Sequence, residues 1–240
     1  MKTTTLRNLY LNQFEANSRL SAIAFRRAIR KDIQRLNPQN LNELVLLETN
    51  NLEQSLLNRF EKNGVKYGNT IYNDLRTQVA NKRFNPVFSQ SWARFVRTNY
   101  QQRLGGKITL LKGTIVDEVS RLVNNTINQA DTIIDLSTAI QEVVNSNAFY
   151  YWQAERIART EVGNAMNQAS EVAVNELGIE VNKRWVAGMD GRERDSHRQA
   201  NGEIVGKDEV FSNGMLYPHD PSGDAEEVIN CRCVVQYIPK

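Results

Sequence analysis

Residues 228–235 read Val-Ile-Asn-Cys-Arg-Cys-Val-Val, and this stretch decides how the C-terminal part of the chain is organised. Its flanking residues are β-branched, which is typical of a buried strand. Side chains two residues apart in a strand point to the same face. Cys231 and Cys233 are therefore expected to present two thiols side by side, with Arg232 on the opposite face. A disulfide between them is disfavoured because a strand aims their Cβ atoms in parallel.

Two parallel thiols suit a shared soft metal ion. Zinc takes four tetrahedral ligands, usually Cys and His, and both histidines of the protein also lie near the C-terminus. We predict one structural zinc ion, and its expected ligands are His197, His219, Cys231 and Cys233. Asp190 and Asp220 are alternatives to His219 as the last ligand. A small, loop-rich module gains most from such a staple because its own core is thin.

Three other readings of the cysteine pair stay open at this stage. Buried free cysteines often serve as small hydrophobic residues. A nucleophilic thiolate with His197 as its base is a second reading, although an apolar strand raises a thiol pKa. A metal-dependent hydrolase using His197, Cys231 and Cys233 around an open zinc position is the third. Against the hydrolase, no acid/base Glu stands at a fixed helical offset from paired ligands.

The overall composition indicates a protein with a real core and a polar surface. Of 240 residues, 40% are hydrophobic, and the mean hydropathy is −0.52. No run approaches the ~18 apolar residues of a membrane span, so we expect none.

Charge is divided unevenly along the chain. Residues 1–150 hold 20 basic and 12 acidic residues, whereas residues 151–240 hold 10 and 15. The basic excess is strongest in a leader at residues 1–35, which suggests an acidic partner such as double-stranded DNA. The residues predicted to bind DNA are Arg26, Arg27, Arg30 and Lys31. A solvated helix face without any partner explains the same charges.

Residues 1–130 are predicted to form a helical bundle or an extended helical arm, because apolar residues recur at spacings of three and four. The first helix runs to Leu36 and ends at Asn37-Pro38. Two dipeptides that contain glycine are predicted to end later helices, Asn63-Gly64 as a C-cap and Gly105-Gly106 as a break. The helices expected after the first cover residues 41–63, 71–79 (stopping before Asn85-Pro86), 92–104 and 108–122.

Residues 131–240 are predicted to form a second module with helices over 136–177 and a β-rich part over 181–238. A short helix capped by Asp135 or Ser137 precedes a long helix over 150–177. The expected strands are Val181–Val186, Glu203–Val205, Val210-Phe211, Met215–Tyr217 and Cys231–Ile238. The fold class is therefore α+β.

The long helix carries two charged residues that call for partners. Glu161 falls on its otherwise apolar band, and a buried charge needs a partner. Arg159 stands four residues after Glu155, so simple surface pairing is one explanation. The alternative is that Arg159 or Glu161 faces the C-terminal module and fixes it to this helix.

Taken together, the C-terminal half resembles the Mu F-like phage minor head proteins, also called head-morphogenesis proteins. The resemblance covers roughly residues 130 to 236. It rests on Ala158, Arg159, Thr160, Glu161, Asn167 and Ala169 on one helix, then Trp185, Asp190, Arg192, Arg194, His197, Gly202, Phe211, Pro218, Asp220 and the Ile229-Asn230-Cys231-Arg232-Cys233 close.

The resemblance implies a minor structural protein of a tailed-phage head, associated with the portal and with packaged DNA. Its implied partners are portal and capsid proteins, and its implied place is the virion interior, with host cytoplasm during assembly. No catalytic residues follow from it, and the metal-dependent hydrolase remains the alternative. The residues expected to form the structural motif are Arg159, Glu161, Trp185, Asp190, Arg192 and Arg194.

Overall fold

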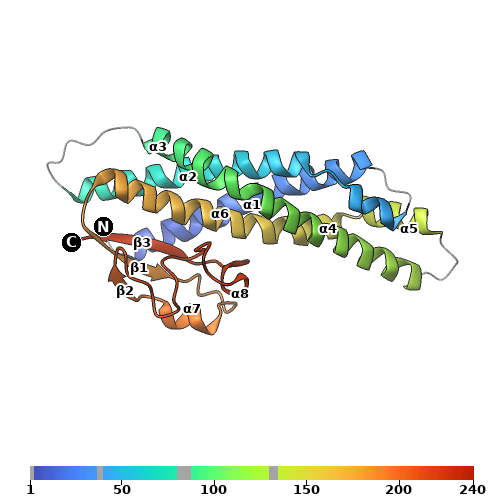
Figure 1. Ribbon diagram of the computed structural model, residues 1–240. Coiled ribbons are helices and arrows are strands. Elements are labelled where there is room, and N and C mark those ends of the chain that lie inside the picture. The colour runs from blue at the N-terminus through green and yellow to red at the C-terminus, as the bar shows by residue number, and fades with distance from the viewer. Residues whose placement is uncertain (1–2, 37–39, 80–87, 130–134) are drawn as a thin grey trace.

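The computed structural model describes residues 3–36, 40–79, 88–129 and 135–240 and shows an α+β protein dominated by long helices (Figure 1). The helices are α1 (Thr3–Leu36), the 3-10 helix η1 (Leu41–Leu46), α2 (Asn50–Gln78), α3 (Phe88–Phe95), the π-helix η2 (Val96–Tyr100), α4 (Gln101–Gln129), α5 (Leu136–Asn145), α6 (Asn147–Leu177), α7 (Asp195–Ala200) and α8 (Ala225–Val228). The strands are β1 (Val181–Val186), β2 (Ile204–Gly206) and β3 (Val234–Pro239). The fold class predicted from the sequence is confirmed.

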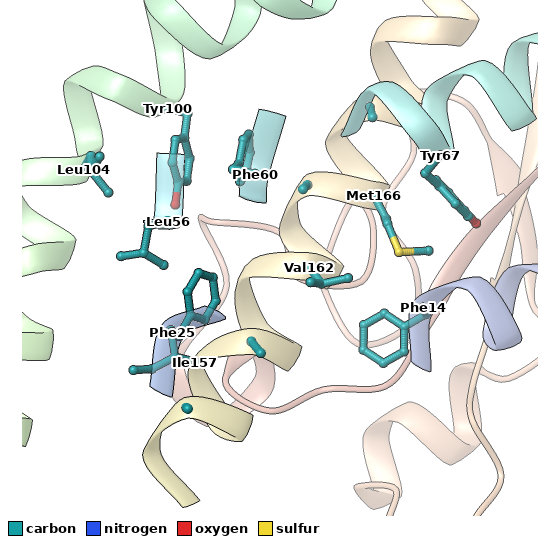
Figure 2. Packing of buried hydrophobic residues seen from close by; sticks show 14 of the residues in the cluster. Phe14, Phe25, Leu56, Phe60, Tyr67, Tyr100, Leu104, Ile157, Val162 and Met166 are labelled. Carbon is teal, nitrogen blue, oxygen red and sulfur yellow. The ribbon is translucent and has the colours of Figure 1, made fainter. Parts of the chain in front are cut away.

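Helix α6 lies at the centre of an elongated bundle, where it packs chiefly against α1 and α2 (Figure 1). Small side chains on α6 allow this close approach, and Ala158, Ala165 and Ala169 have no exposed surface. Buried aromatic residues of α1 and α2, such as Phe14 and Phe60, lie in the same core as Val162 and Met166 of α6 (Figure 2). The aromatic residues of the leader and its neighbours are thus core residues, as their helical spacing predicts.

The sheet has the order β2-β1-β3 with antiparallel neighbours, and it docks on one side of the bundle (Figure 1). Val181 pairs with Pro239 and Val186 with Val234, so β3 runs back along the whole of β1. Val235 and Tyr237 join the main core, and β3 packs against α6. A second, smaller core lies beyond the sheet and consists of Trp185, Ala187, Ala200, Phe211, Met215, Val228, Cys231 and Cys233.

Several predicted elements are confirmed with nearly the expected bounds. The first helix ends at Leu36, α6 ends at Leu177, and β1 spans Val181–Val186. Asp135 is the N-cap of α5, where its side chain accepts a hydrogen bond of 3.0 Å from the Thr138 backbone N–H. This geometry satisfies one of the free N–H groups at the start of the helix.

The prediction that Asn63-Gly64 ends a helix is wrong, because α2 continues through both residues to Gln78. The helices expected over 41–63 and 71–79 are therefore one helix from Asn50, preceded by η1. The glycine serves packing: a Cβ atom at Gly64 would overlap the Trp92 ring, and one at Gly68 would overlap the Phe88 ring. Close approach of α3 explains these glycines.

The expected helix end at Gly105-Gly106 is also wrong, since both glycines lie inside α4. Nothing lies within 4 Å of a Cβ atom built at either position. A glycine inside a helix costs only about 1 kcal/mol relative to alanine, so two of them do not end a helix of this length.

Two of the expected strands are absent from the described C-terminal region. Residues 210–211 and 215–217 form no strand; between them lies a turn in which Phe211 N–H donates to Met215 O at 3.0 Å and Gly214 N–H donates to Phe211 O at 2.8 Å. The last strand begins at Val234, so Cys231 and Cys233 lie in the loop before it. Asn230 has a φ of 60°, which breaks the extended conformation just before the cysteines.

Two predicted helix breaks, Asn37-Pro38 and Asn85-Pro86, lie outside the described residues. Among the parts of the chain that the structure describes, no helix combines the length and the apolar character needed to cross a membrane.

Candidate metal centre and basic groove

His197, Cys231 and Cys233 form a buried cluster of potential metal ligands. One ligand atom from each residue lies within 4.8 Å of the other two. The His197 Nδ1 atom lies 3.5 Å from the Cys231 Sγ atom and 3.5 Å from the Cys233 Sγ atom. The two thiols lie close together, as predicted, but in a loop and not on the predicted strand.

The opposite edge of the His197 ring faces a carboxylate. Its Nε2 atom lies 2.7 Å from Glu227 Oε2, although the direction of approach falls outside hydrogen-bond geometry. Ser196 Oγ donates to the same carboxylate at 3.0 Å and 3.2 Å, which holds Glu227 in place. A carboxylate on the far nitrogen is the usual partner of a metal-bound histidine.

The two thiols have opposite pKa shifts. Burial raises the pKa of the Cys231 thiol, but hydrogen bonding with Cys233 and the neighbouring His219 and His197 rings outweigh it, so this pKa lies well below its usual value. Hydrogen bonding with Cys231, together with burial, raises the pKa of Cys233 well above its usual value. The lowered pKa of Cys231 differs from the simple rise expected for a thiol in an apolar strand.

His219 lies close to this cluster but is not part of the tight group. Its side chain has no exposed surface, and its backbone φ is 63°. Neither ring nitrogen has a hydrogen-bond partner among the described residues, and the ring packs against the backbone of Gly163 on α6. It contributes to the lowering of the Cys231 thiol pKa.

The two aspartates considered as alternative ligands are engaged elsewhere. Asp190 pairs with the Arg232 guanidinium. Asp220 accepts hydrogen bonds from the backbone N–H groups of Leu216 at 3.1 Å and Ser222 at 2.9 Å, which closes a turn. Neither carboxylate belongs to the group of three ligand residues.

The loop that carries the cysteines is fixed to α6. Arg159 Nη1 donates to Asn230 Oδ1 at 3.2 Å, and the Asn230 backbone N–H donates to Thr160 Oγ1 at 2.9 Å. Farther along, the Val235 N–H donates to Asn167 Oδ1 at 2.9 Å. Arg159 also keeps its helical pairing with Glu155 at 3.4 Å, so both interpretations of this arginine hold together.

Glu161 faces the other way, toward α4. It accepts hydrogen bonds from Tyr100 Oη at 2.9 Å and from Lys107 Nζ at 2.8 Å. Burial, with a smaller effect from the Glu161 carboxylate, raises the pKa of Tyr100 well above its usual value. The need for a partner was predicted from the sequence, but the partner lies in the helical bundle and not in the C-terminal module.

The remaining motif residues surround the cluster. Trp185 is fully buried, and its ring contacts the rings of His197 and Phe211 edge-on, with centroids 5.2 Å apart in both pairs. Arg194 Nη2 donates to the Ile229 carbonyl at 2.7 Å. A cavity of about 150 Å³ lies against the three ligands, and four arginines line it: Arg159, Arg192, Arg194 and Arg232.

A second feature is a basic groove of about 680 Å³ between α1 and α2. Among the residues that the structure describes, none of the lining is acidic. The cationic lining residues, which define the basic groove below, are Arg27, Arg30, Lys31, Arg35, Arg59 and Lys62. Three of the four residues predicted to bind DNA are among them. The fourth, Arg26, does not line the groove.

Sequence reasoning missed Glu227 as the partner of His197 and the α2 wall of the basic groove. For Glu227 the local sequence holds no signal, because 30 residues separate it from His197. For the groove a signal was available: Arg59 and Lys62 lie three residues apart on one helix, which places them on neighbouring positions of its surface.

Residues 117–236 match the family described as phage Mu protein F like protein, and the chain belongs to this family. The resemblance expected from the sequence is confirmed, and the family indicates a phage head protein and hence a place in the virion. The match begins inside α4, includes α5, α6, β1, β2 and the whole His197 cluster, and ends within β3.

Two curated relatives match about half of the chain. An Enterococcus faecalis protein named NAD(+)--arginine ADP-ribosyltransferase EFV is 28% identical over 137 residues, which is 55% of this chain and 28% of the relative. The uncharacterized protein YqbB of Bacillus subtilis is 25% identical over 133 residues, 52% of this chain and 43% of the relative. The chain therefore spans less than half the length of either relative. No solved structure matches it significantly.

Proposed function

We propose that this protein is a minor structural component of a tailed-phage head, located inside the head beside the portal and in contact with packaged double-stranded DNA. Membership of the Mu F-like family supports the head assignment. The protein would act in head morphogenesis or in genome packaging and delivery, and would be present in the host cytoplasm during assembly.

The observation that carries the DNA contact is the basic groove. In the described part of the chain, six cationic side chains from two helices line it, without an acidic residue among them. Two of them, Arg27 and Lys31, are exposed and stand four residues apart on α1, so both reach the same surface. Phosphate groups of DNA are the polyanion such a surface attracts, because each contact releases condensed counterions.

The uneven distribution of charge along the chain supports different partners for its N-terminal and C-terminal parts. The part after residue 150 has more acidic than basic residues, whereas the basic groove lies wholly in the first 62 residues. DNA repels an acidic surface, so we assign the C-terminal module to contacts with portal and capsid proteins. The helical part then faces the genome.

A DNA-binding titration over a range of salt concentrations tests the nucleic-acid contact. The triple variant Arg27→Gln, Lys31→Gln and Lys62→Gln should weaken binding and flatten the dependence of log affinity on log salt. Each lost phosphate contact reduces this slope by about 0.9 for duplex DNA. The loss of three such contacts should therefore reduce the slope of log affinity against log salt by about 2.7 in total.

The matched control is Arg94→Gln, Arg97→Gln and Arg103→Gln, which removes the same charge from exposed positions on α3, η2 and α4. Arg97 Nε and Arg103 Nε donate to the backbone carbonyls of Ala93 and Asn99, one turn earlier. If both triple variants lose the same affinity, the groove has no special part in binding. Binding that does not depend on salt would contradict the contact altogether.

Cross-linking in purified particles tests the location. Heads assembled with and without this protein are compared for composition, and cross-linked peptides identify its neighbours. We expect cross-links from residues 181–240 to portal or capsid proteins. We also expect packaged DNA to shield the basic groove from the cross-linking reagent. Absence of the protein from purified heads would contradict the structural role.

An enzymatic role is the second candidate, favoured by the name of the Enterococcus faecalis relative. That name describes a whole protein of which 28% is covered. A hydrolytic metal site also needs substrate access, whereas His197, Cys231 and Cys233 are at most 2% exposed. We expect no release of nicotinamide from NAD+ in the presence of an arginine-containing acceptor. Steady release would overturn the purely structural assignment.

A further inference from the structure

The most chemically specialised feature outside the basic groove is the His197 cluster, which the head function does not require. Its three residues place one imidazole nitrogen against two sulfurs, each at 3.5 Å. In a tetrahedral zinc site with bonds of about 2.3 Å to sulfur and about 2.0–2.1 Å to nitrogen, adjacent N and S ligands lie about 3.6 Å apart. The observed spacing matches that edge on both sides.

We propose that these residues bind one structural Zn²⁺ ion through His197 Nδ1, Cys231 Sγ and Cys233 Sγ, with His219 supplying the fourth ligand. The donor set of two thiolates and two imidazoles is typical of zinc and excludes hard cations such as Mg²⁺ and Ca²⁺, which take oxygen ligands. On binding, the ion displaces the thiol protons still present, and these protons pass to solvent.

The surroundings of the three ligands are arranged as around a bound metal. Glu227 lies 2.7 Å from the far nitrogen of His197, and Ser196 holds that carboxylate. The Cys233 backbone N–H donates to the Cys231 sulfur at 3.3 Å, which stabilises negative charge on the thiolate. The Trp185 ring contacts the imidazole edge-on and limits its rotation.

The fourth position is assigned to His219 because of its burial and its unused nitrogens. A fully buried imidazole with no hydrogen-bond partner at either nitrogen is costly in the described structure. Its ring lies outside the group of three, so a side-chain rotation or small loop shift must bring it to the metal. The carboxylates of Asp190 and Asp220 are already occupied.

The ion would stabilise a part of the molecule that has little core of its own. Eight buried residues make up the smaller core, and both cysteines are among them. The four ligands come from α7, from the loop after residue 215 and from the loop before β3, so one ion ties three separate segments together. Binding energy at such a site contributes directly to folding.

The test begins with the full chain purified without chelators and analysed for metals. We expect one zinc ion per chain, and after removal of zinc with a chelator we expect one Co²⁺ ion to bind with the intense absorption of tetrahedral thiolate coordination. Hydrogen exchange should then show faster exchange in residues 185–233 of the zinc-free protein, with unchanged protection in α1 and α2.

Variants separate the ligands from their neighbours. Cys231→Ser, Cys233→Ser and His197→Gln should each abolish binding, and His219→Gln should weaken it. Glu227→Gln should reduce zinc affinity about 10- to 100-fold, as expected for a group that orients a ligand. Asp190→Asn and Asp220→Asn serve as controls and should retain one zinc.

The wild-type measurements do not depend on the folding of any variant. Zinc-free protein that binds neither Zn²⁺ nor Co²⁺ while residues 185–233 remain protected would overturn the site. Full zinc affinity in His219→Gln would overturn the assignment of the fourth ligand. Loss of zinc in an aspartate control would show that a carboxylate, and not His219, completes the site.

Discussion

Thr160 on α6 accepts a hydrogen bond of 2.9 Å from the backbone N–H of Asn230, a residue 70 positions later in the chain. Asn230 has a left-handed φ of 60° and directly precedes Cys231. Arg159, the residue before Thr160 on α6, donates a hydrogen bond of 3.2 Å to the Asn230 side-chain oxygen. Two adjacent residues of the bundle thus position the loop that carries the cysteines.

The first prediction tests this attachment. Thr160→Val keeps the shape of the side chain but removes the acceptor for the Asn230 N–H, so the free energy of unfolding should fall by about 0.5–1.5 kcal/mol. Thr160→Ser retains a hydroxyl and serves as the control. The measurement is urea unfolding of both variants. An equal loss in Thr160→Ser would mean that the methyl group, and not the hydrogen bond, is responsible.

A second prediction concerns the glycines of α2 and α4. Gly64→Ala introduces a Cβ atom that overlaps the Trp92 ring, so it should destabilise the protein by about 1–3 kcal/mol. Gly105→Ala meets no atom within 4 Å and should instead stabilise it by about 0.5–1 kcal/mol. Thermal unfolding of the two variants checks the opposite signs. A stabilised Gly64→Ala variant would contradict the packing described for α3.

The ion pair between Glu161 and Lys107 allows a third prediction. A double-mutant cycle with Glu161→Gln and Lys107→Met should give a coupling energy of about 0.5–3 kcal/mol. Glu161→Leu should cost more than Glu161→Gln, because it also leaves the buried Tyr100 hydroxyl without its acceptor. Denaturant unfolding of the single and double variants supplies the numbers. A coupling energy near zero would show that the pair is screened by solvent.

The fourth prediction is a pH dependence at the start of α5. Hydrogen bonds from the Thr138 backbone N–H and, to a smaller extent, from its hydroxyl lower the pKa of Asp135 below its ordinary value of 3.8. A lowered pKa in the folded state means that the contribution to stability is present above pH 3.8 and is lost as pH falls through the folded pKa.

Asp135→Asn is the matched control, since asparagine also caps helices but does not titrate. Hydrogen exchange of α5 should become faster at acid pH in the wild type relative to this variant. Asp135→Ala should show fast exchange of α5 at every pH. Identical pH profiles for wild type and Asp135→Asn would contradict the role of the carboxylate.

Much of the helical architecture could be predicted from the sequence, because helix formation depends on residues three and four positions apart. This local pattern is sufficient for the end of α1 at Leu36, the long helix to Leu177 and the cap at Asp135. It is insufficient at Gly64 and Gly105, where the same residue type continues a helix for different reasons. Only the position of the Trp92 ring distinguishes a packing glycine from an exposed one.

For the site, the sequence by itself determined which residue types were available: two cysteines and two histidines within 37 positions, in the stretch 197–233. The tertiary structure decided their geometry. The cysteines meet His197 through a loop with a left-handed Asn230, not through a strand face, and the partner of His197 is Glu227. The basic groove likewise needed α2 to supply its second wall. Local propensities act over a few residues, whereas His197 lies 30 or more residues from Glu227 and the cysteines, and the walls of the groove come from two different helices. Only packing of the whole chain brings such segments together.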